Sequence, residues 1–332
     1  MNNKNNNLIA TQQQIIDLGI SQKNATIYLT YLQSCAVNSK ETIKTTYKTY
    51  FDNMKLFFRY LKQYEGNKYI LSEQTLKDFT EIWERYCNYC YERGNNKRTL
   101  ANKRTAISTF YDWCVKRKKI KYNPFMYIDK IRITESDKRR ESYFLTPQQI
   151  WEINYVMNKD TKNFDLQDKL LFNLFLDSGA RISEIHSLKL EQLNFHDMIF
   201  DNVRLKEGYI ESLIFFENTK HMLEDWIEER KEKDIDNEYL FLTFYNKKYN
   251  KMTKETIRAR IKKIGKIIGI DSFYPHSIRK TILNITGQQN EQIAAALGHH
   301  KDTKVTRKHY MKQKRLVDVR NALEEIRINS GL

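Results

Sequence analysis

Apolar residues recur at the period of an α-helix in the stretch that follows residue 45. The first set is spaced by four, three, four and three residues and consists of Tyr47, Phe51, Met54, Phe58 and Leu61. Such spacing gives a helix one apolar side and leaves polar residues around the rest of it. A second helix is predicted from about Ser72 through Arg93.

A third helix is predicted after the turn at Gly94-Asn95-Asn96, because glycine and asparagine favour turns. Its buried side is expected to consist of Leu100, Ile107, Phe110 and Cys114. The three helices predict a small bundle that closes near Asn123-Pro124. Residues 1–7 are polar and repetitive and are expected to be disordered.

The second half of the chain begins after a charged stretch, residues 129–142, that is poor in large apolar side chains and indicates an extended linker. Thr146 and Pro147 then suit the N-cap and the first position of a helix. The run from Leu170 to Leu176 is apolar on nearly all sides, which predicts a buried helix. Gly179 is expected to end that helix, so that the next turn presents Arg181.

Two β-prone runs, Met198 to Leu205 and Tyr209 to Phe216, flank the short turn Lys206-Glu207-Gly208 and predict a hairpin. Thr253 is expected to cap a later helix whose apolar side is Ile257, Ile261 and Ile264. The predicted fold class is mainly α with a small β-sheet: a helical bundle joined to an α+β domain. The predicted divisions are an N-terminal segment 1–24, a bundle 25–128, a linker 129–143 and a second domain 144–332.

The charge of the chain is unevenly distributed. The 332 residues include 57 Lys and Arg against 41 Asp and Glu, a formal net charge of +16. Residues 1–140 carry 26 basic and 13 acidic side chains, so this half is strongly basic and the remainder is nearly balanced. The asymmetry favours a nucleic-acid partner held mainly by the first half. The candidate DNA-binding residues are Lys97, Arg98, Lys103, Arg104, Lys116, Arg117, Lys118, Lys138, Arg139 and Arg140.

Other classes of protein are disfavoured by composition. No apolar run approaches the roughly 18 residues that a membrane span needs. The N-terminus lacks the apolar core of a secretory signal, and the four cysteines resemble the reduced residues of a cytoplasmic, nucleoid-associated protein. Cys87 and Cys90 form a CxxC within a helical pattern, and helix packing is favoured there over zinc or redox chemistry.

Basic residues that suit phosphodiester chemistry lie in three separate places. Arg181 is in Ser178-Gly179-Ala180-Arg181-Ile182-Ser183-Glu184, and His276 and Arg279 are in an HxxR. Leu297-Gly298-His299-His300 precedes Tyr310. Guanidinium groups bind phosphate oxygens in pairs, and a phenol can hold phosphate covalently. The sequence has no carboxylate cluster of the kind that holds catalytic metals, so chemistry without a metal or other cofactor is predicted.

The order and spacing of these motifs resemble those of the tyrosine recombinases, also called phage-type integrases. The resemblance extends from roughly Lys40 to Tyr310 and includes the bundle, the linker and the Leu145-Thr146-Pro147 entry to the second domain. It implies a core-binding domain and a catalytic domain that close on DNA as a clamp.

The resemblance also implies a role for each motif residue. Tyr310 would attack the scissile phosphate, form a 3′-phosphotyrosyl link and release a 5′-hydroxyl. Arg181 and Arg279 would neutralise the phosphate, with Glu184 supporting the site. His276 would act as a general base or hydrogen-bond the phosphate, and His299 would hydrogen-bond a nonbridging oxygen.

Two assignments depart from the family pattern. The family uses a hairpin lysine as general acid, and Lys206 is chosen for its distance from Arg181, although the usual flanking glycines are absent and Arg204 is close by. The segment from His299 to Tyr310 is about two residues longer than usual, which leaves His300 as an alternative to His299.

The predicted assembly is a homo-tetramer on two double-stranded DNA sites, with strand exchange through a Holliday junction. Leu316, Val319, Leu323 and Ile326 form one apolar stripe of a terminal helix, which would dock either on a neighbouring protomer, as in the family, or on its own domain. Two alternatives to a site-specific recombinase are a nicking-closing enzyme like the type IB topoisomerases and a DNA-binding regulator without catalysis.

Overall fold

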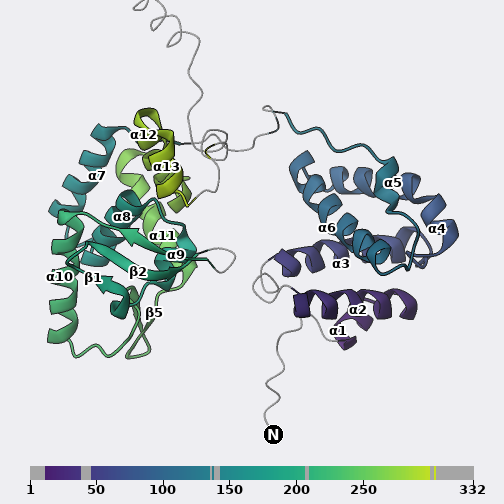
Figure 1. Ribbon diagram of the computed structural model, residues 1–332, viewed down its shortest axis with the longest axis horizontal. Helices are drawn as coiled ribbons and strands as arrows, with labels where there is room; N and C mark the ends of the chain where they lie inside the picture. Colours follow the sequence, from purple (N-terminus) through teal and green to yellow (C-terminus); the bar gives the residue numbers. More distant parts are fainter. Residues whose placement is uncertain are drawn as a thin grey trace, which may run out of the picture. The chain divides into compact units, whose positions relative to one another are not determined.

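The chain divides into two compact units, residues 1–140 and 141–332. The computed structural model describes residues 12–38, 46–134, 137, 143–205, 209–299 and 303, and Figure 1 shows their helices and strands. No helix within these ranges is long and apolar enough to cross a lipid bilayer.

The first unit is helical throughout its described ranges. Its elements are α1 (Gln12–Ile16), α2 (Gln22–Asn38), α3 (Lys48–Tyr64), α4 (Glu73–Lys77), α5 (Phe79–Glu92), α6 (Lys97–Lys116) and the 3-10 turn η2 (Pro124–Tyr127). The core is rich in aromatic rings that meet edge to face, as Tyr28 and Phe58 do at 5.4 Å between centroids. The predicted apolar sides of α3 and α6 both face this core, which confirms the two helical patterns.

Two features of this unit differ from the sequence prediction. The helix expected from Ser72 through Arg93 is two helices, interrupted at Asp78, a poor helix former whose carboxylate accepts from Gln74 Nε2 at 2.8 Å. The boundary expected after residue 24 falls inside α2. Asn24 is fully buried and bonds Lys68 O at 2.8 Å and Ile70 N at 3.0 Å, so this helix belongs to the bundle.

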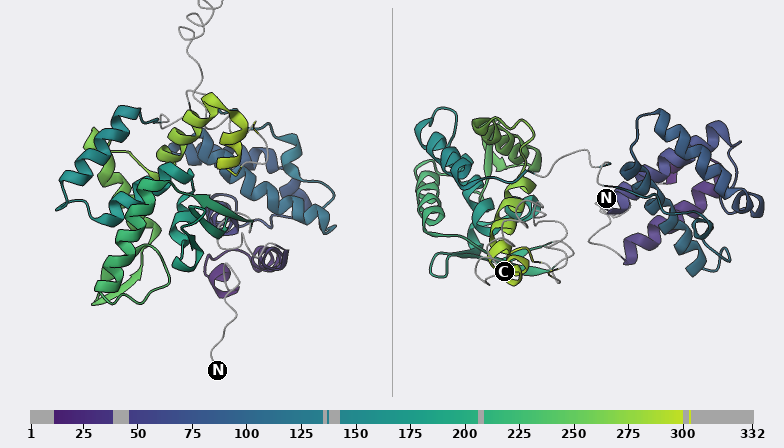
Figure 2. Two further views of the ribbon diagram at one scale, coloured as in Figure 1. Left: turned by 60° about the vertical axis from the view of Figure 1, so that its left-hand side comes forward. Right: turned by 90° about the horizontal axis from the view of Figure 1, so that it is seen from above.

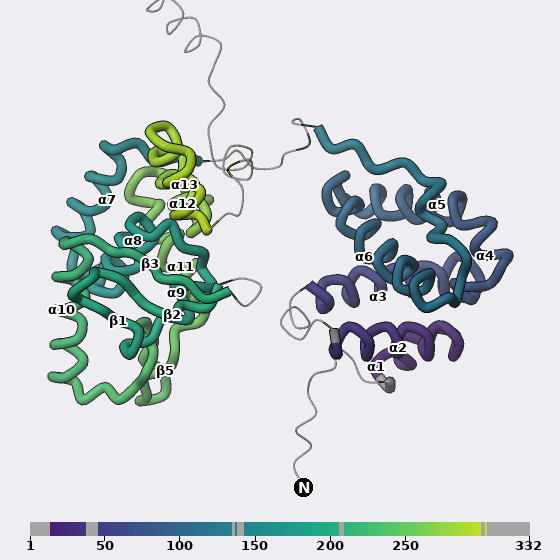
Figure 3. The backbone as a smooth tube through the Cα atoms, viewed as in Figure 1, coloured from purple at the N-terminus to yellow at the C-terminus, as the bar shows by residue number. Residues whose placement is uncertain are grey.

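The second unit combines helices with two small antiparallel sheets. Its elements are α7 (Pro147–Lys159), α8 (Leu166–Ser178), α9 (Ile182–Ser187), η4 (Leu190–Gln192), β1 (Leu193–Asn194), β2 (Ile199–Arg204), β3 (Ile210–Ile214), α10 (Glu217–Glu232), β4 (Leu242–Tyr245), β5 (Lys248–Lys251), α11 (Lys254–Gly265), η6 (Lys266–Ile268), α12 (Pro275–Gln289) and α13 (Glu291–Leu297). Figure 2 shows this unit from two further sides, and Figure 3 labels α8 within it. Helix α8 packs against α7, α9, α10, α11, α12 and β3.

Several elements of the second unit confirm the sequence prediction. Thr146 Oγ1 accepts from Gln149 N at 3.2 Å, so Thr146 caps α7 as expected. Strands β2 and β3 pair antiparallel as the predicted hairpin, with β1 on the far side of β2. The turn of this hairpin, residues 206–208, lies outside the described residues. The pairing of β4 with β5 was not predicted, because only Leu242 of β4 is buried and no clear alternation is visible.

A buried carboxylate joins the start of α8 to α11. Asp168 is 1% exposed, and its two oxygens accept from Arg260 Nη1 at 2.9 Å and Lys263 Nζ at 2.7 Å. The same aspartate closes the capping box of α8 with Asp165. Truncation of such a buried, doubly bonded carboxylate is destabilising, because Lys263 then loses its counterion and Arg260 keeps only Asp165.

We therefore expect Asp168→Ala to lower the free energy of unfolding by about 3–5 kcal/mol. Glu217→Ala is the matched control, since Glu217 pairs with Lys220 at 3.0 Å on the surface, and it should cost less than about 1 kcal/mol. Urea denaturation of the full chain, with hydrogen exchange of α8 amides as the local probe, measures both. Equal losses for the two variants would contradict the importance of this buried pair.

Candidate active site

The turn after α8 brings distant parts of the second unit close together. Gly179 ends the helix with a left-handed backbone, φ +57°, as the sequence predicted. A Cβ at this position would lie 3.3 Å from Ile282 Cγ2 and 3.5 Å from Leu297 Cγ. Glycine is therefore required both by backbone conformation and by the close approach of α12 and α13.

Arg181 stands at the N-cap of α9, where Glu184 fixes it at two points. The carboxylate of Glu184 accepts from Arg181 N at 2.6 Å and from Arg181 Nη1 at 3.0 Å. Glu184 is fully buried, while the side chain of Arg181 is 29% exposed. The buried carboxylate thus orients a guanidinium that still reaches solvent, which is what a phosphate-binding arginine needs.

Arg279 links the three sequence motifs. It is 1% exposed within α12, and its Nη1 donates to Gly179 O while its Nη2 donates to Gly298 O at 2.6 Å. These partners are 100 and 19 residues away along the chain. One guanidinium therefore holds the Arg181 turn and the end of α13 against α12.

His276 lies in the first turn of α12. The protein around its ring, together with the positive charges of Lys280, Arg279 and Arg181, lowers its pKa to about 4, although the side chain still contacts solvent. The ring is therefore neutral near pH 7 and able to accept a proton. The charge of Arg181 acts on this ring even though the two residues are far apart in sequence.

His299 follows α13 in a left-handed conformation, φ +48°. Burial lowers its pKa, and the charges of Glu184, Arg279 and Arg181 also act on it. A residue other than glycine rarely adopts this backbone, which costs of order 1–2 kcal/mol. The structure thus brings His299 together with Arg181, Arg279 and His276.

The remaining predicted residues of this site, Tyr310, Lys206 and His300, lie outside the described residues. Sequence reasoning missed the carbonyl groups of Gly179 and Gly298 as partners of Arg279. The signal available was the glycine in each motif, since a missing side chain permits close backbone approach.

The predicted DNA-binding residues of the first unit differ in their surroundings. Arg98, Lys116 and Lys118 are exposed, and Lys97 forms an ion pair with Asp137 at 3.2 Å. Lys138, Arg139 and Arg140 lie outside the described residues.

Lys103 and Arg104 were expected on the surface; the structure buries Lys103 and leaves Arg104 half-buried. Lys103 is 4% exposed, and burial lowers its pKa, because it lies on the side of α6 that packs into the bundle. Arg104 Nη2 donates to Phe125 O at 3.2 Å and Ile128 O at 3.0 Å. These bonds tie α6 to the segment around η2.

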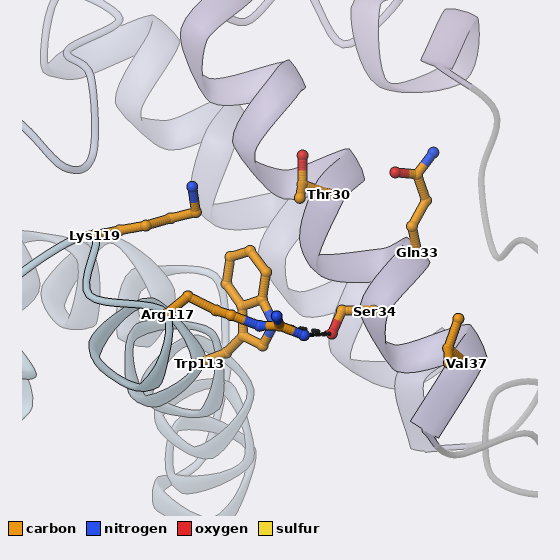
Figure 4. A pocket seen from close by; sticks show the side chains of 7 residues that line it. All are labelled: Thr30, Gln33, Ser34, Val37, Trp113, Arg117 and Lys119. Carbon is orange, nitrogen blue, oxygen red and sulfur yellow. Dashed lines mark hydrogen bonds between the residues drawn. The ribbon is translucent and has the colours of Figure 1, made fainter.

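Arg117 lines an open cleft of about 490 Å³ between α2 and the end of α6 (Figure 4). Its Nη2 and the indole Nε1 of Trp113 donate to Ser34 Oγ, at 3.3 and 3.1 Å. Lys119 stands on the other side of the indole in the same view. An indole with two cations suits a nucleic-acid chain, so Arg117 stays a predicted DNA-binding residue.

The CxxC cysteines lie on α5, as the helical pattern predicted. Burial raises the pKa of the Cys87 thiol to about 12 and also raises the pKa of Cys90. Both thiols are therefore protonated near pH 7 and serve as packing groups in the bundle.

Comparison with known proteins gives concordant results. Residues 143–315 match the model of the phage integrase family. The tyrosine recombinase XerC of Thermodesulfovibrio yellowstonii is 25% identical over 294 residues, which cover 83% of this chain and 89% of the relative. The XerC of Bacillus pumilus is 27% identical over 232 residues, covering 64% of this chain and 70% of the relative.

Solved structures share the fold at low sequence identity. The Tn1549 transposon integrase in complex with circular intermediate DNA has a TM-score of 0.64 at 18% identity, covering 90% of this chain and 98% of that one. A lambda integrase dimer bound to a core site has a TM-score of 0.62 at 14% identity, covering 87% and 98%. These likenesses show that the chain has an integrase fold.

The lowered pKa of His276 gives a prediction for the DNA-free protein. We expect its ring to titrate with a midpoint near 4, and Lys280→Gln to raise that midpoint by removing one neighbouring positive charge. Because the pKa of His276 in the folded protein lies below its ordinary value, the free energy of unfolding should decrease as the pH falls from 6.5 to about 4.

NMR of the imidazole Cε1–H resonances measures the midpoint. Lys231→Gln is the control, since Lys231 pairs with Glu228 on α10 at 2.9 Å and should leave the His276 titration unchanged. A wild-type midpoint near 6.5 would contradict the proposed clustering of cations around this ring.

Proposed function

The chain belongs to the phage integrase family and is a tyrosine site-specific recombinase, and from this premise we propose how its residues divide the chemistry. The observation that carries the proposal is the bonding of Arg279 to Gly179 O and Gly298 O. It gathers two guanidinium groups and two imidazoles from three segments of the chain. Such a group of fixed donors suits one phosphate.

In the proposed reaction, Arg181 and Arg279 bind nonbridging oxygens of the scissile phosphate. The phenolic oxygen of Tyr310 attacks phosphorus, its proton passing to His276 or to water, and the bond to the 5′-oxygen breaks. The neutral ring of His276 supports its role as acceptor, because a protonated imidazole has no free lone pair. His299, or His300 in its place, donates to the second nonbridging oxygen.

We assign the leaving-group proton to Lys206 in the turn between β2 and β3. The 5′-oxygen leaves as a hydroxyl when this ammonium donates to it, and the reverse transfer accompanies rejoining. The phosphotyrosyl ester conserves the energy of the broken bond, so the reaction needs no nucleotide cofactor.

We propose that the assembly is a homo-tetramer bound to two duplex sites. The two sites would exchange strands through a Holliday junction, as in the movement of a mobile element. Two points support this assembly: the similar lambda integrase structure is a dimer bound to a core site, and the apolar stripe expected from Leu316 to Ile326 would need a surface to cover. The basic first unit would hold the duplex through its phosphates.

Tyr310→Phe should abolish the covalent adduct with DNA, because it removes the nucleophilic oxygen and leaves the ring. The assay uses a nicked suicide duplex from the sequences that flank the gene, from which the cut end diffuses away. Wild-type protein should accumulate a protein–DNA adduct on denaturing gels. Tyr245→Phe is the matched control, since Tyr245 is exposed at the end of β4, and it should react normally.

Three outcomes separate the alternatives. Binding without any adduct in the wild type would support a regulator without catalysis. Relaxation of supercoiled plasmids that lack the site would support a topoisomerase-like enzyme. An adduct that survives in Tyr310→Phe would overturn the assignment of the nucleophile.

Truncation before Leu316 should abolish pairing of two DNA sites while leaving a single site bound. The physical reason is loss of the apolar stripe that would dock on a neighbouring protomer. Native gels with two labelled duplexes of different length measure synapsis. If the truncated chain pairs sites normally, the tail docks on its own domain or has another role.

A further inference from the structure

A second group of basic residues lies beside the Arg181 helix. Lys251 is the last residue of β5 and Lys254 the first residue of α11, with only two residues between them. His186 is in the last turn of α9, which packs against α11. The contact of α9 with α11 therefore brings His186 near the junction of β5 and α11 that carries the two lysines. Figure 1 labels these three elements.

The charges of this group act on one another. Burial and the charges of Lys251 and Lys254 lower the pKa of His186 to about 4, against a smaller opposing effect of Glu255. Burial and the charge of Lys254 also lower the pKa of Lys251. Lys251 Nζ is held 3.8 Å from the centre of the Tyr239 ring. Neighbouring like charges repel one another, and an anion that joins them relieves this repulsion.

The nearby carboxylates are already engaged by other bases. Glu238 accepts from Lys189 at 2.8 Å, and Glu255 pairs with Arg258 at 2.8 Å. Across the described ranges, no carboxylate lies within ion-pair distance of Lys251 or Lys254. The two ammonium groups thus remain available to an anion from outside the chain.

The position of the group relates it to the proposed catalytic phosphate. Arg181 and His186 are five residues apart, which corresponds to about 7.5 Å along α9 at the α-helical rise. Successive phosphates of one DNA strand advance by about 3.4 Å along the helix axis. A duplex with its scissile phosphate at Arg181 therefore has further phosphates within reach of this group.

We propose that His186, Lys251 and Lys254 bind a backbone phosphate of the substrate DNA within a few nucleotides of the scissile phosphate. This inference rests on the proposed function, because it assumes a duplex at Arg181. The contact fixes the register of the duplex and carries no sequence information. His186 donates a ring N–H to the phosphate, and the two lysines supply charge.

The double variant Lys251→Gln/Lys254→Gln tests the site. Binding to a short mixed-sequence duplex is measured at a series of salt concentrations, because each lost phosphate contact reduces the salt slope of log K by about 0.9. Lys248→Gln is the control: it lies on β5 as well, but in the alternating exposed position rather than the half-buried one of Lys251. We expect the slope to fall by about one in the double variant and to stay unchanged in the control.

Ethylation interference identifies which backbone phosphates the protein contacts. Ethylation of one phosphate near the cleavage site should weaken binding of the wild-type protein but not of the double variant. An unchanged salt slope, or an equal fall in Lys248→Gln, would refute the site. The site would also be refuted if millimolar inorganic phosphate shifted the His186 resonance as much as the duplex does, because that result would indicate a site for free anions.

Failure of the proposed chemistry would be distinguishable from failure of this site. If wild-type protein formed no adduct, the salt slopes of the two variants would still report on the phosphate contact. If the adduct formed and the salt slope of the double variant equalled that of the wild-type protein, only the present inference would fail.

Discussion

The second unit depends on a buried guanidinium bonded to two backbone carbonyls. Arg279 carries a positive charge at 1% exposure, and burial of a charge is unfavourable unless its hydrogen bonds are made. Gly179 O and Gly298 O make two of them. Because each carbonyl belongs to a different motif, the hydrogen bonds that Arg279 requires also fix the positions of Arg181 and His299. Stability and site geometry therefore have the same cause.

The site that results has more fixed positive than negative charge. Glu184 is its one buried carboxylate among the described residues, and both of its oxygens are occupied by Arg181. Burial, and after it the nearby cations, lowers the pKa of His276 and His299, so the imidazoles are neutral donors and acceptors rather than further charges. Such an arrangement suits the phosphate that we propose as its ligand, whose charge the arginines would neutralise without a rearrangement of the protein. The cations around His186 repeat this principle on the adjoining surface.

Basic residues in this chain serve two different purposes, and their environment separates them. Lys103 and Arg104 are in the same helix as Arg98, yet Lys103 is buried and Arg104 bonds the backbone around η2. In the second unit, Arg260 and Lys263 neutralise Asp168. Net charge alone therefore overstates the positive surface that the chain offers to DNA, because part of the charge is buried or neutralised inside the protein.

The sequence by itself determined the local elements: the apolar sides of α3 and α6, the end of α8 at Gly179, and the hairpin of β2 with β3. Periodicity and turn residues act over a few positions, so they are readable without the fold. The motif arginines were found by resemblance of order and spacing to a family. Only the tertiary structure decided that Arg279 bonds Gly298 O, that Asn24 joins α2 to the bundle, and that Lys103 is buried. These outcomes depend on which distant backbone groups need a partner after packing, and no local pattern encodes that pairing.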